Sequence, residues 1–441
     1  MHRFAAAFPL SLLLPLTALG QVDSAPADSP TPATSAVIST APLTAGERIV
    51  LRSEILGEDV SMNLYLPKGF SVSSPDHTYP VLFANGAHGE EFFTTLVGIV
   101  ELLASRERMP ETIVVSLNDI GAIPTVHTNG MWRAETLGGG SNPRDHLLHL
   151  EHEVIPFLEG NYRANGYRLI LGVSGSSLFP IYTFTEAPHL FKGHILIAAA
   201  DTIGMGYAPG ETFIDAFEAA LRKAPERRAK LYLATAEGDL DGKPDYVKNL
   251  EDMRRRLGSL AGMELEVDVF PETDHYGVFL EAVRAALDQS FPKAMWSARY
   301  RDLVAQPGNA LENIDAYYRD LSARYGFEIL PRADRWNNVN NLRFMTRHLI
   351  GLDRASEAVD VAKRRVEYRP REAGSYSGLA DALEAQGDLG GAVGAQGTAV
   401  LLARTAGDPG AERAQERLDT LRTALAQEAA LAQGEGANAD P

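Results

Sequence analysis

Short runs of β-branched and other apolar residues fill the middle of the chain, and stretches with helical spacing separate them. Several runs are apolar at nearly every position, as in strands covered on both faces. We predict eight strands: Arg48–Leu56, Ser61–Leu66, Pro80–Ala84, Thr112–Leu117, Arg168–Val173, His194–Ala198, Lys230–Ala234 and Glu264–Phe270. The predicted helices between them include Glu91–Leu103, Arg144–Leu158, Phe213–Lys223, Asp245–Leu257 and Gly277–Leu287. This alternation predicts an α/β fold: a mostly parallel sheet with helices on both faces, opened by an antiparallel pair.

The two ends of the chain do not follow this pattern. Residues 1–20 combine a basic start, an apolar run broken by prolines and a small-residue exit. These features predict a cleaved signal peptide, and hence a secreted or periplasmic protein without membrane insertion after cleavage. The alternative is a buried first helix. Residues 21–43, mostly Ala, Ser, Thr and Pro, predict a disordered linker, and residues 433–441 a disordered tail.

A different pattern begins near residue 293, after a first domain expected over residues 44–292. The segments Ala355–Pro370 and Leu389–Arg404 resemble each other, and their residues Ala358 and Ala392 lie 34 positions apart. This spacing resembles tetratricopeptide repeats, in which small residues let paired helices pack closely. Ala310–Tyr325 and Ala411–Ala432 would then flank or cap the repeats. The alternative is a plain helical bundle. We expect an all-α domain over residues 293–432 that packs on the first domain, dimerises or contacts a partner protein.

Composition narrows the classes of function. The 441 residues include 41 Lys and Arg against 58 Asp and Glu, for a net charge of −17, and no cysteine. Such an acidic chain has no basic patch for nucleic acid or anionic lipid. The lack of cysteine excludes disulfides, zinc–thiolate sites, iron–sulfur clusters and thiol nucleophiles. We expect no cofactor.

A serine follows the strand Arg168–Val173 within a run of small residues, Gly172-Val173-Ser174-Gly175-Ser176. A sharp strand-to-helix turn crowds its neighbours, so small residues flank a serine whose hydroxyl projects above the sheet, an arrangement called the nucleophile elbow. Ser176 stands where a second glycine is usual. The alternative interpretation is a helix cap, a position that serine also favours. Ser174 is the candidate nucleophile.

A serine nucleophile needs a histidine base and a carboxylate that orients it. His275 lies in the loop between the last predicted strand and the helix Gly277–Leu287, at the carboxyl edge of the sheet. The carboxylate is expected in the loop after Lys230–Ala234. Asp239 is the first choice, because Gly238 allows a turn there, and Glu237 is the second. Asp201, which follows another strand, is a further alternative, and each of the three acids could equally be a surface residue.

Two further predictions concern the surroundings of this site. The oxyanion that forms on an attacked carbonyl needs N–H donors. We expect these from the backbone of Gly175 and from the loop after Pro80–Ala84, at Ala87. His146, His149 and His152 lie three positions apart on one predicted helix, which suggests a metal site. Their spacing spreads the rings around the helix, so we interpret them as a solvated face with no metal.

The segment from about Ile49 to Leu287 resembles the putative esterase family of α/β-hydrolases, which includes siderophore-ester-hydrolysing, feruloyl and mycolyl-transferring members. The resemblance is carried by Tyr79–Gly86, Met109–Val115, Gly138–Gly140, the Glu153–Pro156 end of a helix and the Ser174 turn. It implies an α/β-hydrolase fold, with Ser174 as nucleophile, His275 as base and an acid in the loop of Glu237 and Asp239. The chain departs from the family at Ser176, at Val173, where histidine is frequent, and at Ala198–Asp201, where Ser-Pro-Ser is usual.

Three hypotheses follow for function. The first is a serine esterase that cleaves a small-molecule or conjugated carboxylic ester through Ser174, His275 and Asp239 and an acyl-enzyme. The second is an inactive hydrolase fold that serves as a scaffold through its helical repeats, which the altered turn would favour. The third is an acyltransferase that uses the same residues. Turnover of an ester and labelling by a fluorophosphonate separate the first from the second.

Overall fold

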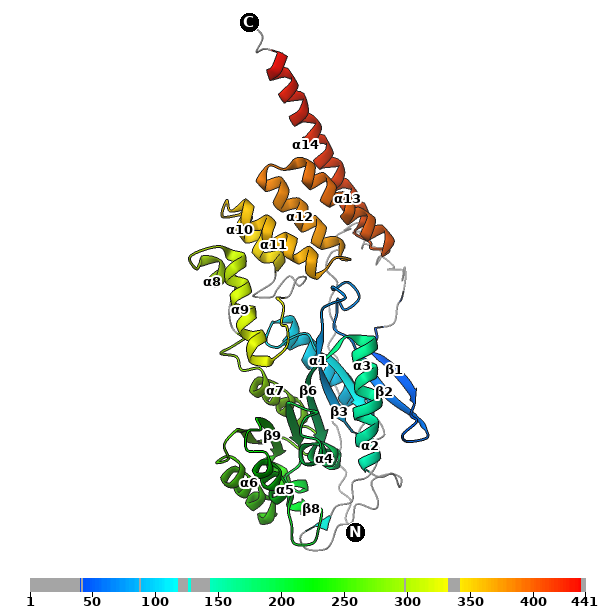
Figure 1. The fold of residues 1–441 in the computed structure, drawn as a ribbon, viewed down its shortest axis with the longest axis vertical. Helices are drawn as coiled ribbons and strands as arrows, with labels where there is room; N and C mark the ends of the chain where they lie inside the picture. The colour runs from blue at the N-terminus through cyan, green and yellow to red at the C-terminus, as the bar shows by residue number, and fades with distance from the viewer. Residues whose placement is uncertain are drawn as a thin grey trace, which may run out of the picture. The chain divides into compact units, whose positions relative to one another are not determined.

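An eight-stranded sheet forms the centre of the computed structural model (Figure 1), which describes residues 40, 43–86, 89–117, 126–127, 143–296, 299–331 and 342–437. Its strands are β1 (Glu47–Arg52), β2 (Asp59–Tyr65), β3 (Tyr79–Asn85), β4 (Ile113–Leu117), β6 (Ala164–Val173), β7 (Gly193–Ile197), β9 (Ala229–Ala236) and β10 (Met263–Phe270). They lie in the order β1-β2-β4-β3-β6-β7-β9-β10. The pairs β1–β2 and β2–β4 are antiparallel, and from β4 to β10 all neighbours are parallel. A separate short pair joins β5 (Val126–His127) and β8 (Met205–Gly206).

Helices cover both faces of this sheet. Neighbouring residues of β6 point to opposite sides: Leu169 and Leu171 pack with α1 and α7, whereas Ile170 packs with the helices of the other face. The first face carries α1 (Gly89–Ser105) and α7 (Phe279–Ser290). The second carries α2 (Pro143–His149), α3 (Ile155–Tyr162), α4 (Leu178–Glu186), α5 (Phe213–Lys223) and α6 (Pro244–Leu257). The prediction of an α/β fold with an antiparallel start is confirmed.

The helix predicted over Arg144–Leu158 contains a wider turn. A π-helical stretch, Leu150–Val154, separates α2 from α3. Pro156 lies in the first turn of α3 and has no N–H to donate to the preceding turn. The π stretch lies immediately before this proline, where an α-helical hydrogen-bond pattern is interrupted in any case.

Two of the three histidines of this helix do not lie on a solvated face. His146 and His149 are buried, with exposed fractions of 2% and 6%, whereas His152 is exposed. His149 Nδ1 lies 2.5 Å from Glu153 Oε2. Glu153 also accepts hydrogen bonds from the Ser53 hydroxyl at 2.6 Å and from two backbone N–H groups of the β1–β2 loop. The prediction for His146 and His149 was wrong because the β1–β2 loop covers this side of the helix.

Glu153 fastens the β1–β2 loop, and the charge on its carboxylate contributes to the stability of the fold. Burial alone would raise the pKa of Glu153, but the hydrogen bonds from His149, Ser53 and the loop backbone outweigh burial and lower this pKa to about 2. Glu153→Gln is therefore expected to lower the free energy of unfolding at pH 7 by about 2 kcal/mol.

The pH dependence of that loss provides the check. A carboxylate with a lowered pKa stabilises the folded state above its ordinary pKa, and this contribution disappears as the pH falls toward 2. Urea unfolding of both proteins should give free energies that converge between about pH 4.5 and pH 2. Glu159→Gln on the same helix, which removes only a surface pair with Arg168, should stay within about 0.5 kcal/mol of the parent. If the difference in unfolding free energy between the parent and Glu153→Gln did not change with pH, the lowered pKa of Glu153 would be refuted.

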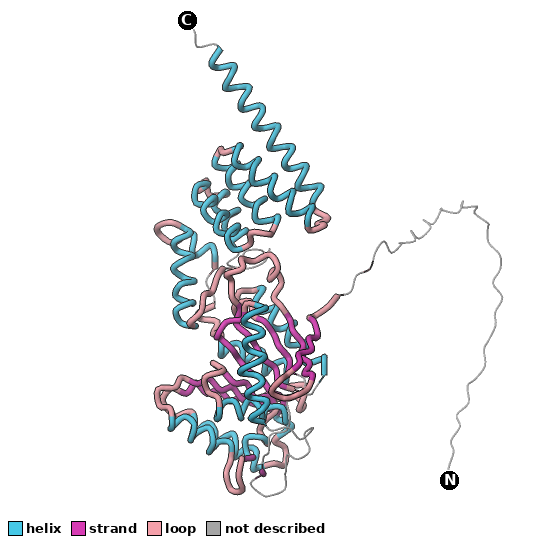
Figure 2. Tube along the Cα trace, turned by 45° about the vertical axis from the view of Figure 1, so that its right-hand side comes forward, coloured by secondary structure: helices cyan, strands magenta, loops and turns pink. Residues whose placement is uncertain are grey.

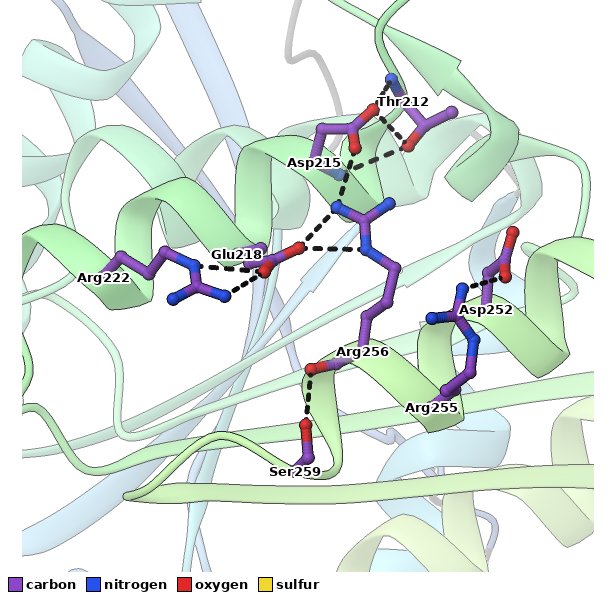
Figure 3. A network of polar contacts seen from close by, with 8 residues as sticks. All are labelled: Thr212, Asp215, Glu218, Arg222, Asp252, Arg255, Arg256 and Ser259. Atoms are coloured by element: carbon purple, nitrogen blue, oxygen red, sulfur yellow. Dashed lines mark hydrogen bonds and ion pairs between the residues drawn. The ribbon is translucent and has the colours of Figure 1, made fainter.

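A network of charged side chains joins α5 to α6 (Figure 3). Arg256 of α6 contacts Asp215 at 2.8 Å and Glu218 at 2.5 Å, and Glu218 also pairs with Arg222. Asp215 forms a capping box with Thr212 at the start of α5. The strand β9 lies between these two helices in the sequence, so the network restrains both flanks of the segment that carries the predicted acid.

The rest of the described chain is helical (Figure 2). It comprises α8 (Tyr300–Ala305), α9 (Ala310–Tyr325), α10 (Leu342–Ile350), α11 (Ala355–Tyr368), α12 (Ala373–Gln386), α13 (Leu389–Thr405) and α14 (Ala411–Ala437). From α10 to α14 each helix packs against the next. Helix α14 continues past residue 432, where a loose tail is predicted. The likeness to tetratricopeptide repeats stays a prediction. No helix among the described residues combines the length and the apolar character that a bilayer span needs.

The helical region shares its core with the sheet. One continuous apolar cluster includes Leu171 of β6, Phe291 after α7, Ile314 of α9 and Val359 of α11. Residues 45–441 accordingly form one compact unit. A group of aromatic side chains lies between β6 and the segment that follows α7. It comprises Tyr167, Phe291, Trp296, Tyr325 and Phe327.

Two buried polar contacts join the same parts of the chain. The Tyr318 hydroxyl donates to Glu107 at 2.6 Å. Arg369, at the end of α11, donates from one nitrogen to both carboxylate oxygens of Glu111, each at 3.2 Å. The Arg369 and Glu111 side chains are only 4% and 10% exposed, so this ion pair is shielded from solvent.

Candidate active site

Ser174 occupies a strained turn at the carboxyl end of β6. Its φ angle is +52°, a left-handed conformation that non-glycine residues adopt at an energetic cost. A 3-10 turn, Ser174–Ser177, follows at once and leads into α4. This is the strand–turn–helix context of a nucleophile elbow, and it holds the hydroxyl of Ser174 at the edge of the sheet, half-buried.

Gly172 makes this turn sterically feasible. A Cβ atom on Gly172 would lie 2.5 Å from the carbonyl oxygen of Ser176 and 2.6 Å from Cα of Ser177. Gly172→Ala should therefore displace the turn and lower the free energy of unfolding by about 1–3 kcal/mol, as overpacking does. Gly166→Ala is the matched control, since Gly166 lies in the same strand and a methyl group there would have nothing within 4 Å. Urea unfolding of both variants is the measurement, and equal stabilities would contradict the steric argument.

Asn85 is a contributor that the sequence reasoning missed. Its side-chain amide, at the end of β3, donates a 2.8 Å hydrogen bond to the backbone carbonyl of Ser176. The bond fastens the turn that follows Ser174 to the neighbouring strand. Ser176 thus supports the turn through its backbone carbonyl. A serine stands here where a glycine is usual, and the strand–turn–helix geometry still forms. The position of an amide at a strand end beside the predicted turn was the available signal.

His275 lies within hydrogen-bond distance of Ser174. The distance from His275 Nε2 to Ser174 Oγ is 2.9 Å, although the two residues are 101 positions apart. The loop after β10 carries this histidine, and Asp274 stabilises it by accepting hydrogen bonds from the backbone N–H groups of Tyr276 and Gly277. The imidazole is therefore presented by a fixed turn.

Asp239 is the carboxylate that contacts His275. Both of its oxygens lie 3.0 Å from His275 Nδ1, and Thr235 donates a 3.3 Å hydrogen bond to one of them. Glu237, the second choice, is exposed and is not hydrogen-bonded to the histidine within the described part of the chain. Asp201 instead accepts hydrogen bonds from Thr202 at the start of another short turn. The structure brings Ser174, His275 and Asp239 together and leaves Glu237 and Asp201 apart.

The two expected oxyanion donors have different outcomes. Gly175 follows Ser174 in the 3-10 turn, which is the position that the elbow geometry requires for its backbone N–H. Ala87 lies outside the described residues, so the second donor stays a prediction. Among the described residues, no group of three or more His, Cys, Asp or Glu could hold a metal ion.

Aromatic rings adjoin His275 on its solvent side. The ring of Tyr276 is T-shaped to His275 at 4.8 Å and is 48% exposed. Phe92 of α1 lies 6.1 Å from Tyr276 and 4.7 Å from Phe279. Tyr276 and the half-buried Phe92 thus place apolar surface near the histidine, whereas Phe279 is buried.

Comparison with known families agrees with this geometry. The model of the family described as "Putative esterase" matches residues 53–293, more than half of the chain. The chain belongs to the Putative esterase family. The family is one of esterases, and this protein is a carboxylic ester hydrolase. The matched segment runs from the β1–β2 loop to just past α7, and therefore contains Ser174, Asp239 and His275.

Several solved structures resemble the fold of this esterase. An IroE-like serine hydrolase from Shewanella oneidensis is 16% identical, with a TM-score of 0.51 over 72% of this chain and 96% of its own. A protein from Capnocytophaga ochracea, also 16% identical, covers 86% of this chain and 100% of its own at a TM-score of 0.48. Siderophore hydrolase EstA from Aspergillus nidulans is 14% identical and covers 56% of this chain and 96% of its own at 0.45. The likeness to the first of these shows the α/β-hydrolase fold. A comparison with curated protein sequences found no match.

Proposed function

We propose that this esterase hydrolyses carboxylic esters through an acyl-enzyme on Ser174. In the first step, Ser174 Oγ attacks the ester carbonyl carbon while His275 Nε2 takes the hydroxyl proton. Asp239, which contacts Nδ1, holds the ring in orientation and stabilises the imidazolium that forms. The backbone N–H of Gly175 donates to the developing oxyanion.

The second half of the reaction reverses the proton transfers. His275 returns the proton to the departing alkoxide, and the alcohol leaves. A water molecule then gives a proton to His275 Nε2 and attacks the acyl carbon. The acid is released, and the proton returns to Ser174 Oγ. One ester and one water molecule are consumed, one alcohol and one acid are released, and the proton is back on Ser174 at the end, so atoms and charge balance.

The observation that carries this proposal is the unbroken series of contacts from Ser174 Oγ to His275 Nε2, at 2.9 Å, and from His275 Nδ1 to Asp239, at 3.0 Å. Such an arrangement is what a serine needs to become nucleophilic at neutral pH. It also argues against an inactive scaffold, because Ser176 does not displace the hydroxyl from the imidazole. The apolar rings beside His275 suit an uncharged part of a small-molecule or conjugated ester.

Two reagents test the proposal directly. The purified full-length protein should turn over a p-nitrophenyl acyl ester, and a fluorophosphonate should label it at one site with parallel loss of turnover. Peptide mapping of the labelled protein should find the modification on Ser174. Absence of both turnover and label would refute the proposal, and a label on another serine would reassign the nucleophile. Products that depend on an added alcohol acceptor would show acyl transfer.

We also propose that the protein acts outside the cytoplasm. The support is the pattern of residues 1–20, which lies outside the described part of the chain. Expression in a bacterium with an export pathway, followed by fractionation and amino-terminal sequencing, should find a mature protein that begins near residue 21. An uncleaved protein in the cytoplasm would contradict this.

A further inference from the structure

A polar cavity lies in the helical region, between α10, α11 and α12. Its volume is about 190 Å³. This is about ten times the space that a single water molecule needs. The residues that line it come mainly from one face of each of two helices: Arg343, Thr346, Arg347 and Ile350 on α10, and Gly374, Ser377, Gly378 and Asp381 on α12. Both sets have the spacing i, i+3, i+4, i+7, so two helix faces form opposite walls.

Small residues keep the α12 wall open, and Arg365 of α11 occupies the floor. A Cβ atom on Gly374 would lie 3.2 Å from one guanidinium nitrogen of Arg365, and one on Gly378 would lie 3.0 Å from another. Arg365 is 3% exposed and donates to the carbonyl of Gly374 at 2.7 Å. Larger side chains at these two positions would fill the space above Arg365. The cavity is therefore open because both positions are glycine.

The acidic residues of the cavity are already paired with cations of the protein. Glu372 accepts from Arg365 at 3.2 Å and from the Ser375 hydroxyl at 2.7 Å. Asp381 accepts from Arg417 of α14 at 3.2 Å, an arginine that also pairs with Glu384. Both carboxylates thus contact other arginines, and neither forms an ion pair with Arg343 or Arg347.

Arg343 and Arg347 lie one helical turn apart and are exposed. Neither side chain forms a hydrogen bond or an ion pair with any other residue that the structure describes. Their guanidinium groups carry only donors, and such groups pair best with carboxylate or phosphate oxygens. The cavity thus presents two positive charges that form no ion pair with the described residues, in a chain whose net charge is −17.

We infer that the cavity between α10 and α12 binds a compact oxyanion, a carboxylate or phosphate group, through Arg343 and Arg347. The hydroxyl of Ser377 lies on the opposite wall and is a further donor to the ligand. Gly374 and Gly378 leave room for the body that carries the anionic group. The inference does not depend on the ester chemistry at Ser174.

Isothermal titration calorimetry on the full-length protein at low ionic strength tests the inference, with inorganic phosphate and succinate as separate probes. At least one probe should bind saturably with a stoichiometry of one. The double variant Arg343→Gln/Arg347→Gln should weaken this binding at least tenfold. Arg371→Gln, which removes an exposed arginine outside the cavity, is the matched control and should change the affinity less than twofold.

Two further measurements keep the outcome decisive. Ser377→Leu, which retains both arginines but fills the cavity, should also weaken binding, and circular dichroism should show unchanged helix content in every variant. Tighter binding of phosphate would assign a phosphate ligand, and tighter binding of succinate a carboxylate ligand. Absence of saturable binding by either probe, or equal affinity in the double variant and the parent, would overturn the inference.

Discussion

Replacing Ser174 by alanine should lower kcat for a p-nitrophenyl ester by about 10⁴- to 10⁶-fold, the range seen when a serine nucleophile is removed. The loss follows from the 2.9 Å contact between Ser174 Oγ and His275 Nε2, since no other hydroxyl of the described chain lies within hydrogen-bond distance of that nitrogen. Fluorophosphonate labelling should disappear with the activity. Stopped assays with long incubations and a high concentration of the variant, measured by its absorbance, give the residual rate.

Ser176→Ala is the matched control for this experiment. Ser176 lies in the same 3-10 turn, and its contribution to the turn is a backbone carbonyl that alanine retains. The control should keep turnover within a few-fold of the parent and should still be labelled. If Ser174→Ala retained full activity, or if both variants lost activity equally, Ser174 could not be the nucleophile.

Asp239→Asn should lower kcat by about 10⁴-fold while leaving the fold intact. An asparagine amide in this position can donate to His275 Nδ1, which would favour the tautomer that lacks a free Nε2 lone pair for the proton of Ser174. The effect should be confined mainly to kcat, because the side-chain contacts of Asp239 are with His275 and Thr235.

Glu237→Gln provides the comparison that decides between the two acids of this loop. Glu237 is exposed and lies two residues before Asp239, so its removal should change kcat less than twofold. Steady-state kinetics on both variants, with melting temperatures as a check of folding, is sufficient. A large loss in Glu237→Gln with little loss in Asp239→Asn would reverse the assignment.

The fold was largely predictable because each strand of the central sheet carries its own local signal. Runs such as Leu169–Val173 are apolar at nearly every position, which only a strand buried on both faces requires, and small residues mark the turn after it. The positions of Ser174 and His275 followed from the rule that chemistry gathers at the carboxyl ends of parallel strands.

Other features depend on tertiary contacts that local patterns do not encode. Asp239 and Glu237 share one loop, and only the direction of the short turn after β9 decides which of them reaches His275. His146 and His149 are polar residues on a helix, yet the distant β1–β2 loop buries this side. Asn85 contacts Ser176 across 91 positions, and its position at a strand end does not by itself identify this partner.

The core shared by the sheet and the helices has a consequence for anyone who would shorten this protein. A fragment that stops near residue 293 would lose Trp296, Tyr325 and Phe327, the aromatic partners of Tyr167 and Phe291. It would also leave the carboxylate of Glu111 without Arg369. We therefore expect residues 45–293 alone to expose a new apolar face, and engineering them as a separate protein would mean replacing side chains of that face with polar ones.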